Sequence, residues 1–309
     1  MRWVSWLLLV LPAAAQRGGP GGDPLARFQW ELQAPWGTAH RQTIIDTIKL
    51  MGSPDGGSIR IAPFQLFDNV YFIGFKTVSA YLVTTSDGLV LLDAGFPQTV
   101  DALVENIRSL GLKPESIKYI LVSHSHIDHF GGAGRVKELT GARVVMSAED
   151  WKAVDEQQEA AQKGGRDLGV RLVRDIVKGE GDSLQVGDTA FKFYFTPGHS
   201  PGALSTEFKV FDRGKEYRAL SPGGMGMQFS AEWTAAYIKS LEHLKELGPW
   251  DVLIGNHPFY LVPEVEEGRR ALANRGDGPN PFVSGPHKID EWLDSGIRVA
   301  KAKLVAESK

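Results

Sequence analysis

Four side chains able to bind a metal ion fall within six consecutive residues. They are His124, His126, Asp128 and His129, in a His-x-His-x-Asp-His run directly after the apolar residues 117–122. Alternate residues of an extended chain point to the same side, so His124 and His126 face one way. Asp128 and His129 come where the strand gives way to a helix. Imidazoles and a carboxylate are ligands that suit zinc, so the run predicts a metal site. A histidine-rich loop without metal is the alternative.

Glycines follow this run at positions 131, 132 and 134. A glycine has no Cβ, so the backbone of the next helical turn can begin close beneath the ligands. The apolar positions Val136 and Leu139 then resume the helical pattern. We therefore expect a helix that starts directly under the metal site.

Two further histidines also follow strand-like segments. His199 comes after residues 191–195 and is flanked by turn-forming Pro and Gly, and His257 comes after the short apolar residues 252–254. His40, His243 and His287 have no strand leading into them, and for these we expect solvated or packed side chains.

The sequence positions sort the six candidates into two groups of three. One zinc ion is predicted to bind His124, His126 and His199. A second zinc ion is predicted to bind Asp128, His129 and His257. Each group leaves a coordination position open, as a catalytic zinc ion requires, and we expect two Zn²⁺ per chain.

With these residues the chain resembles the metallo-β-lactamase fold hydrolases, and within them the third subclass of class B β-lactamases. The resemblance covers roughly residues 61–283. It rests on the ligand run and on the motifs Ile61-Ala62-Pro63-Phe64, Asp68-Asn69-Val70-Tyr71, Ser79-Ala80-Tyr81-Leu82-Val83-Thr84-Thr85, Leu91-Leu92-Asp93-Ala94-Gly95, Thr196-Pro197-Gly198-His199-Ser200-Pro201-Gly202 and Asn256-His257-Pro258. It implies an α/β fold, the four-layer αββα sandwich, whose two βαβ-containing halves share one sheet edge at the site.

A pair of zinc ions at these positions would share a bridging hydroxide as the nucleophile, because metal binding lowers the pKa of water to about 7. The ion on the three histidines would polarise the carbonyl under attack, and the other would stabilise the leaving group. Asp128 has a second, catalytic role as acceptor of a hydrogen bond from the hydroxide. Ser123, Ser125 and Ser200 lie beside ligands, but no histidine remains to activate them, so we expect supporting roles or none.

The stretch between the last two histidines bears on the substrate. Lactonases and thioesterases that resemble this pattern place a metal-bridging aspartate there, whereas residues 219–227 contain no carboxylate. This favours hydrolysis of the β-lactam amide, in penicillins, cephalosporins and, as a further candidate class, carbapenems. The resemblance implies that Ser221 contacts the substrate carboxylate, although Pro222-Gly223-Gly224 departs from the usual serine-rich loop. A hydrolase of another lactone, ester or thioester is the alternative, and a zinc-binding protein without turnover is a third.

Period-two and helical patterns alternate twice along the chain. Strands are predicted at residues 70–75, 79–84, 89–93, 117–122, 143–146, 183–186, 189–195, 204–211, 216–220 and 252–254. Helices are predicted over residues 100–110, 136–139 and 148–162, then from Ser230 to a stop at Gly248-Pro249, and over residues 289–304. Two halves that each alternate strands and helices are typical of sheets packed face to face with helices outside.

The first residues form a pattern of their own. Residues 1–15 have a single basic residue, an apolar core and an Ala-x-Ala end, which predicts a secretory signal peptide. Residues 16–24 are rich in Gly and Pro and are expected to be flexible. Residues 25–309 are predicted to form a single domain. Within it, residues 27–51 carry a short helical stripe that packs on the body or covers the site, and residues 151–178 form either a wall of the site or a solvated helix and loop.

Composition limits the partners and the location. The chain has no cysteine, so its stability in an oxidising compartment must come from burial alone. Loss of Arg2 with the signal peptide changes the formal net charge from −3 to −4, which argues against a nucleic-acid partner. No later apolar run reaches about 18 residues, so we expect no membrane anchor. We expect a periplasmic or secreted protein that acts on a small molecule.

Overall fold

A computed structural model describes residues 42, 45–46, 49–50, 56–227, 230–260 and 263–308. The signal peptide predicted at residues 1–15 and the flexible segment predicted at residues 16–24 lie outside the described residues, as does most of the stripe predicted at residues 27–51. Of that stripe, Ile45 is helical and packs against the apolar cluster beneath the C-terminal helix. The single domain predicted over residues 25–309 stays a prediction.

Seven strands form the first sheet, and their spatial order follows the sequence. They are β1 (Phe64–Phe67), β2 (Val70–Phe72), β3 (Tyr81–Thr85), β4 (Gly88–Leu92), β5 (Ile117–Leu121), β6 (Arg143–Met146) and β7 (Ile176–Val177). Pairing is antiparallel from β1 to β4 and parallel from β4 to β7. The parallel strands therefore end at the same edge of the sheet.

Five strands form the second sheet, in the order β12-β11-β10-β9-β8. They are β8 (Ser183–Val186), β9 (Thr189–Phe195), β10 (Leu204–Asp212), β11 (Lys215–Ser221) and β12 (Val252–Leu253). Pairing is antiparallel except between β11 and β12, which are parallel. A parallel pair needs a crossover connection, and the helix between these two strands provides it.

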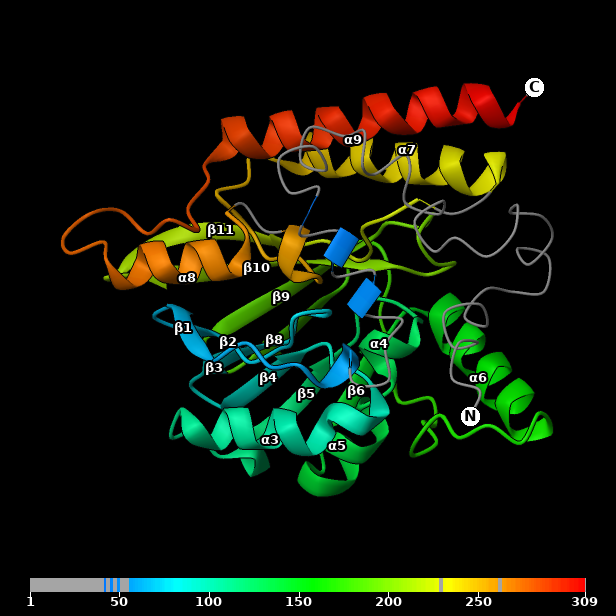
Figure 1. Cartoon of the computed structure of the whole chain (residues 1–309), viewed down its shortest axis with the longest axis horizontal. Coiled ribbons are helices and arrows are strands. Elements are labelled where there is room, and N and C mark those ends of the chain that lie inside the picture. Colours follow the sequence, from blue (N-terminus) through cyan, green and yellow to red (C-terminus); the bar gives the residue numbers. More distant parts are fainter. Residues whose placement is uncertain are drawn as a thin grey trace.

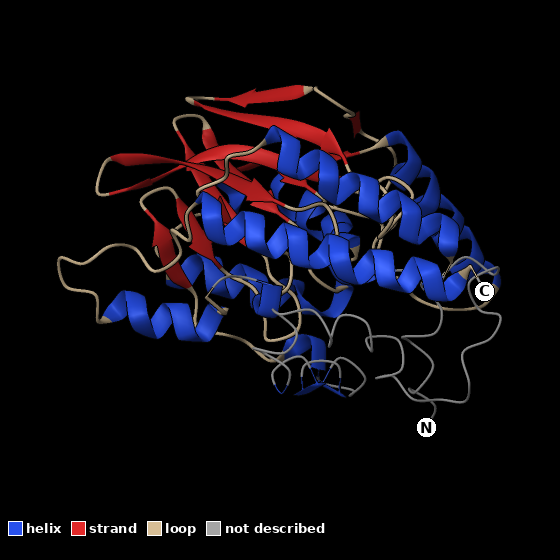
Figure 2. Cartoon of the chain, turned by 90° about the horizontal axis from the view of Figure 1, so that it is seen from above, coloured by secondary structure: helices blue, strands red, loops and turns tan. Residues whose placement is uncertain are grey.

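Helices cover the outer faces of both sheets (Figure 1). The α-helices are α3 (Val100–Ser109), α4 (Ile127–Phe130), α5 (Ala133–Thr140), α6 (Ala148–Lys163), α7 (Ala231–Leu247), α8 (Val265–Ala273) and α9 (Pro286–Glu307), with 3₁₀ turns η4 (Gly56–Ser58), η5 (Pro97–Thr99), η6 (Pro114–Ser116) and η7 (Pro258–Tyr260). Helices α3 and α5 lie against the first sheet, and α7 and α9 lie side by side over the second (Figures 1 and 2). The predicted four-layer αββα sandwich with two βαβ-containing halves is confirmed.

Three apolar clusters fill the spaces between these layers. The first lies between the first sheet and its helices and includes Leu103 and Val144. The second joins the inner faces of the two sheets and includes Phe72 and Phe208. The third lies between the second sheet and helices α7 and α9. Strand β5 has a covered sheet face on each side, so Ile117, Ile120 and Leu121 are buried, while Lys118 near its start is exposed.

Helix ends agree with the predicted signals. The Ser230 hydroxyl accepts a hydrogen bond from the Trp233 amide and caps α7, and α7 ends immediately before Gly248. Gly111 has a φ of 76° just after α3, a left-handed conformation that glycine adopts without strain. These local signals explain why the predicted bounds of the helices lie within a few residues of the observed ones.

Several elements were not predicted, among them the 3₁₀ turns and the short helix α4, and one strand is shorter than expected. Strands β1 and β7 and helix α8 lacked a clear pattern, because β7 has only two residues and α8 buries only Val265 and Gly268 fully. The strand predicted over residues 70–75 ends at Phe72. The chain turns back there, with the Phe75 amide donating to the Val78 carbonyl.

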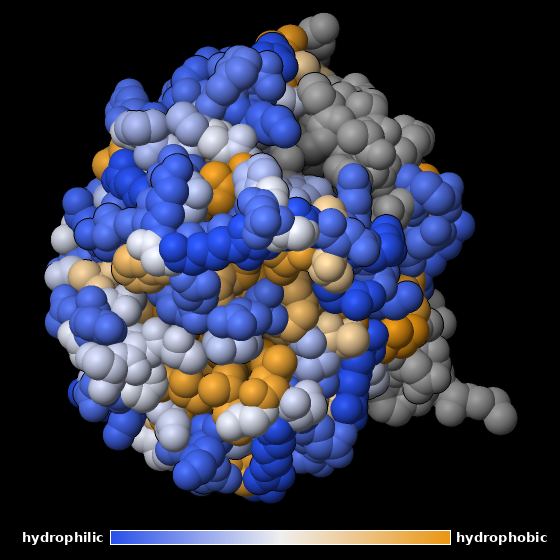
Figure 3. Space-filling model, turned by 90° about the vertical axis from the view of Figure 1, so that its left-hand side faces the viewer, coloured by the Kyte–Doolittle hydropathy of each residue, from blue (hydrophilic) through white to orange (hydrophobic). Residues whose placement is uncertain are grey.

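The surface at the end of the sheets opposite to helix α4 is mostly hydrophilic, with separate apolar areas between polar residues (Figure 3). Among the described residues, no helix combines the length and the apolar character that crossing a membrane requires.

Packing of α9 on α7 predicts a specific stability effect. Leu293 of α9 is fully buried in the third cluster. Leu293→Ala should lower the free energy of unfolding by about 2 to 5 kcal/mol, since the truncation removes buried methyl groups and leaves a cavity. On the same helix Val305 is 60% exposed, and Val305→Ala should change the unfolding free energy by less than about 0.5 kcal/mol. Urea unfolding of both variants measures the difference, and equal effects would contradict the packing.

Candidate metal centre

The predicted ligands come together where strands of both sheets end. His124 and His126 follow β5, and Asp128 and His129 lie in the short helix α4 that comes next. His199 follows β9 of the second sheet, and His257 follows β12. Segments that directly follow strands of the two packed sheets therefore supply every candidate ligand, and the strand ends fix where each segment begins.

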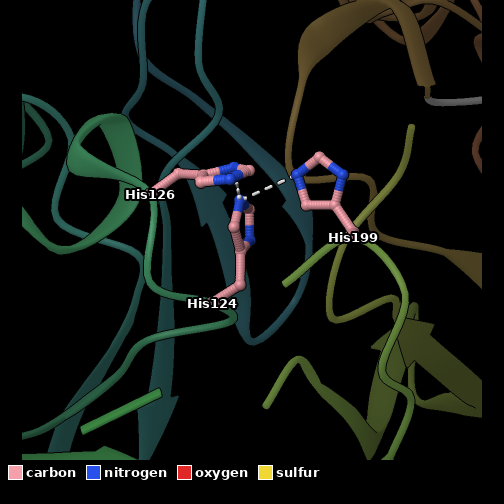
Figure 4. Close-up of side chains that lie close together, drawn as sticks. All are labelled: His124, His126 and His199. Carbon is pink, nitrogen blue, oxygen red and sulfur yellow. Dashed lines mark hydrogen bonds between the residues drawn. The ribbon is translucent and has the colours of Figure 1, made fainter. Parts of the chain in front are cut away.

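The first group consists of three imidazole rings that converge on one point (Figure 4). The Nε2 atom of His124 lies 3.0 Å from Nδ1 of His126 and 3.1 Å from Nε2 of His199. One nitrogen from each ring lies within 4.8 Å of those of the other two. The structure thus brings together the three histidines predicted for one zinc ion.

Asp128, His129 and His257 form the second group, and it is buried. Their ligand atoms also lie within 4.8 Å of one another. The Nε2 atoms of His129 and His257 lie 3.3 and 3.9 Å from Oδ2 of Asp128. The rings of His124 and His129 are 4.0 Å apart between centroids, so the two groups are neighbours.

Asp93 is the main support of both groups. Its Oδ2 lies 2.7 Å from Nδ1 of His129 and accepts a hydrogen bond from the Ser123 hydroxyl at 2.8 Å. Because this hydroxyl gives its only hydrogen to Asp93, it accepts from Nδ1–H of His124, 2.9 Å away. One carboxylate therefore orients His129 directly and His124 through Ser123.

Backbone carbonyls hold two other rings in the same way. Nδ1 of His199 donates to the Gly226 carbonyl at 2.8 Å, and Nδ1 of His257 donates to the Thr77 carbonyl at 2.7 Å. A proton held on Nδ1 leaves the lone pair on Nε2, which is the atom that faces the group. The tautomers are assigned from these hydrogen bonds.

This arrangement fits a bound cation. With Nδ1–H fixed on His124 and His199, their Nε2 lone pairs face each other at 3.1 Å with no proton between them. In the second group, Nε2 of His129 is buried and has no hydrogen-bond partner among the described residues, although the Asp128 carboxylate is close. Converging lone pairs and an orphaned ring nitrogen are stabilised when a metal ion accepts them.

Electrostatics distinguish the two groups. Burial lowers the pKa of His124 and His199 well below the usual value, and neighbouring histidines add to this effect. Burial also lowers the pKa of His129, but the carboxylates of Asp128 and Asp93 outweigh it and raise that pKa to about 10. Burial would raise the pKa of Asp128, and His129 outweighs this and keeps the pKa far below its usual range. Without metal, both ring nitrogens of His129 therefore carry a proton at neutral pH.

Glycines allow the backbone to approach the ligands. A Cβ on Gly132 would lie 2.2 Å from the Ala94 carbonyl oxygen, so α5 could not begin there with another residue. A Cβ on Gly224 would lie 2.5 Å from the ring of His199. The loop of residues 221–227 thus packs on His199 and binds it through Gly226. Ser221 is half-buried at the end of β11, and its contact with a substrate stays a prediction.

Sequence reasoning assigned no role to Asp93 or Asp150. Asp93 follows β4, the same position relative to a strand as the ligands, and its φ of 56° is a strained conformation for a residue with a side chain. Ser123, Ser125 and Ser200 do have supporting roles, because each hydroxyl donates to one of these two carboxylates.

The remaining histidines lie apart from the ligands, whereas the segment 151–178 reaches the ligand run at one point, where the Gln157 side chain donates to the Ser125 carbonyl. His243 interacts with Glu180, His287 is exposed, and His40 lies outside the described residues. Helix α6 is not a solvated helix on all sides, because Trp151 and Val154 are fully buried. The chain after α6 is fixed by Gln158, whose side chain hydrogen-bonds both the amide and the carbonyl of Leu172.

Comparisons with known proteins agree with this geometry. A model of the metallo-beta-lactamase superfamily matches residues 73–210. The crystal structure of BJP-1, a subclass B3 metallo-beta-lactamase of Bradyrhizobium japonicum, is 30% identical, covers 82% of this chain and 98% of its own, and superposes with a TM-score of 0.67. The chain belongs to the metallo-beta-lactamase superfamily. It is therefore a hydrolase of this superfamily, and its clustered histidines and aspartate indicate that it uses metal.

Curated proteins related in sequence include a probable metallo-hydrolase and a lactonase. The Bacillus subtilis protein named Probable metallo-hydrolase YqgX is 27% identical over 156 residues, which are 50% of this chain and 71% of the relative. An N-acyl homoserine lactonase of Bacillus thuringiensis is 24% identical over 199 residues, 55% of this chain and 76% of the relative. The likeness in sequence thus includes proteins named for a different substrate.

Metal binding at the second group should release a proton. Since the pKa of His129 is about 10 without metal, the protonated ring must lose the proton on Nε2 before that atom can bind zinc. Below that pKa, the apparent zinc affinity of this group should rise about tenfold per pH unit. Calorimetric titration between pH 6 and 8, in buffers of different ionisation enthalpy, measures the release. Asp93→Asn should reduce it, and metal uptake without proton release at pH 7 would contradict the protonation of His129.

Proposed function

We propose that this superfamily hydrolase binds two Zn²⁺ ions and hydrolyses the amide of β-lactams, including penicillins and cephalosporins. The observation that carries the proposal is the pair of adjacent three-donor groups together with the loop over His199. Residues 219–227 contain no carboxylate that could bridge two ions. The structural likeness to a subclass B3 metallo-beta-lactamase over nearly the whole of that enzyme supports the same substrate class.

Zinc ions held by the two groups would supply a Lewis acid and a water molecule whose pKa is lowered to about 7. The three neutral imidazoles of the first group bring no charge, so an ion there keeps its full positive character next to a substrate carbonyl. Asp128 stays ionised, since its pKa is far below the usual range, and can accept a hydrogen bond that orients the attacking water. Addition of water across the C–N bond places oxygen on the carbonyl carbon and a proton on the ring nitrogen.

Hydrolysis of a lactone is the second candidate. It is favoured by the N-acyl homoserine lactonase of Bacillus thuringiensis among the sequence relatives. An ester carbonyl could be attacked at the same two groups. The absence of a carboxylate in residues 219–227 argues for the β-lactam. An assay of cephalosporin turnover distinguishes the two candidates.

Turnover of a chromogenic cephalosporin by the zinc-loaded protein tests the proposal. Chelator should abolish turnover, and zinc should restore it. His199→Ala should lower kcat/KM at least about 100-fold, because the first group loses one of its three donors. His243→Ala is the matched control, since this histidine lies on α7 and interacts with Glu180, and it should leave kcat/KM unchanged.

Zinc-dependent cleavage of an N-acyl homoserine lactone without any cephalosporin turnover would overturn the β-lactam proposal and support the second candidate. Zinc binding without cleavage of any amide, ester or thioester would overturn both.

We also propose that the protein is exported and acts in the periplasm or outside the cell. The support is the apolar segment of residues 1–15 with its Ala-Ala-Ala end. Expressed in a Gram-negative host, the protein should accumulate in the periplasmic fraction and begin at Gln16. Intact-mass measurement of that fraction checks the cleavage, and a cytoplasmic chain that retains Met1 would contradict export.

A further inference from the structure

Asp150 is a buried carboxylate that belongs to neither donor group. It lies in the first turn of α6 and is 1% exposed. The described structure pairs it with no lysine or arginine, so only hydrogen bonds oppose the effect of burial, which still raises the pKa of this carboxyl above its usual value. A buried carboxylate held in this way is costly unless every donor around it is well placed.

Four donors from two separate loops bind this carboxylate. The Ser125 amide donates to Oδ2 at 3.0 Å, and the Ser125 hydroxyl donates to Oδ1 at 2.9 Å. The Ser200 hydroxyl donates to Oδ2 at 2.7 Å, and the Gly202 amide donates to Oδ1 at 2.9 Å. Each oxygen thus accepts one hydrogen bond from each loop.

These two loops carry the ligands of the first group. Ser125 stands between His124 and His126, and Ser200 follows His199. Helix α6 strengthens the attachment, since the Gln157 side chain donates to the Ser125 carbonyl at 2.8 Å. A Cβ on Gly202 would lie 2.0 Å from the Ser147 hydroxyl oxygen, so this loop packs directly on the start of α6.

We propose that Asp150 is a positioning residue that sets the distance between His199 and the pair His124 and His126. It touches no candidate ligand, and it acts by tying the loop of the second sheet to the loop of the first. The inference rests on the proposed zinc site. It assigns Asp150 to the first group, because Ser125 and Ser200 are sequence neighbours of its three histidines, whereas no residue that Asp150 binds is next to His129 or His257.

Asp150→Asn is the sharpest variant because asparagine keeps the size but has only one acceptor oxygen. Its NH₂ group must face either the Ser125 amide with the Ser200 hydroxyl or the Ser125 hydroxyl with the Gly202 amide. A backbone N–H loses its acceptor in both orientations, so the two loops move apart. The zinc affinity of the first group should fall about 10- to 100-fold, while the second group retains its ion.

Zinc titration of the metal-free protein, with bound ions counted by elemental analysis, measures this effect. Nitrogen NMR of isotope-labelled histidine rings shows which group holds the ion. At a zinc concentration that fills both groups in the unaltered protein, Asp150→Asn should hold one ion, with the rings of His129 and His257 in the metal-bound state. Two ions at unaltered affinity, or equal weakening of both groups, would overturn the proposal.

Asp175→Asn is the matched control. This carboxylate also joins separate segments, accepting from the Val144 amide and the Lys137 ammonium group, but it binds neither ligand loop. The Asp175→Asn variant should bind two ions with unaltered affinity. Ser200→Ala serves if Asp150→Asn does not fold, because it removes one of the four hydrogen bonds and should weaken only the first group. Unaltered affinity in Ser200→Ala would then overturn the proposal.

Metal counting also separates this inference from the proposed function. A protein that binds two ions, loses one in Asp150→Asn and cleaves no β-lactam would support the role of Asp150 and overturn the substrate. A protein that cleaves a β-lactam and keeps both ions in Asp150→Asn would support the substrate and overturn the role of Asp150.

Discussion

The short contact between Asp93 and His129 is the interaction on which the rest of the centre depends. It fixes the ring whose other nitrogen is orphaned in a buried site, and through Ser123 the same carboxylate orients His124. Asp93 reaches this position only by adopting a left-handed backbone conformation at the end of β4. Such strain is stable only where surrounding structure enforces it, and here the Asp93 amide donates to the Leu121 carbonyl at 3.0 Å while its Oδ1 accepts from the Ser123 amide at 2.7 Å.

The sandwich explains why distant parts of the sequence meet. Strands β5 and β9 belong to different sheets, yet the loops after them bring His124 and His199 within 3.1 Å. The apolar cluster between the sheets holds this relation, and glycines at positions 132 and 224 let backbone lie where a side chain would collide. Buried carboxylates and carbonyls then orient the rings. Packing thus sets the coarse geometry, and hydrogen bonds set the fine geometry.

Much of this could be predicted from sequence because the signals are local. The ligand run after an apolar strand, the turn residues around His199 and the cap at Ser230 each depend on a few neighbouring residues. The supports could not be predicted in the same way, since Asp150 reaches Ser200 across 50 positions and Thr77 reaches His257 across 180. The residues next to Asp150 in the sequence do not indicate that its side chain binds a distant loop. Helix α8, which buries only Val265 and Gly268, and strand β7, which has only two residues, were missed because each is too sparse or too short to form a recognisable local pattern.

The division of the ligands between the two sheets has a consequence for the newly made chain. The first sheet alone supplies two histidines to one group and Asp128 with His129 to the other, and the second sheet supplies a single histidine to each. A half-folded chain therefore holds no complete donor set. Both donor groups are complete only once the two halves have docked, so a half-folded intermediate lacks the geometry that the folded chain offers a metal ion.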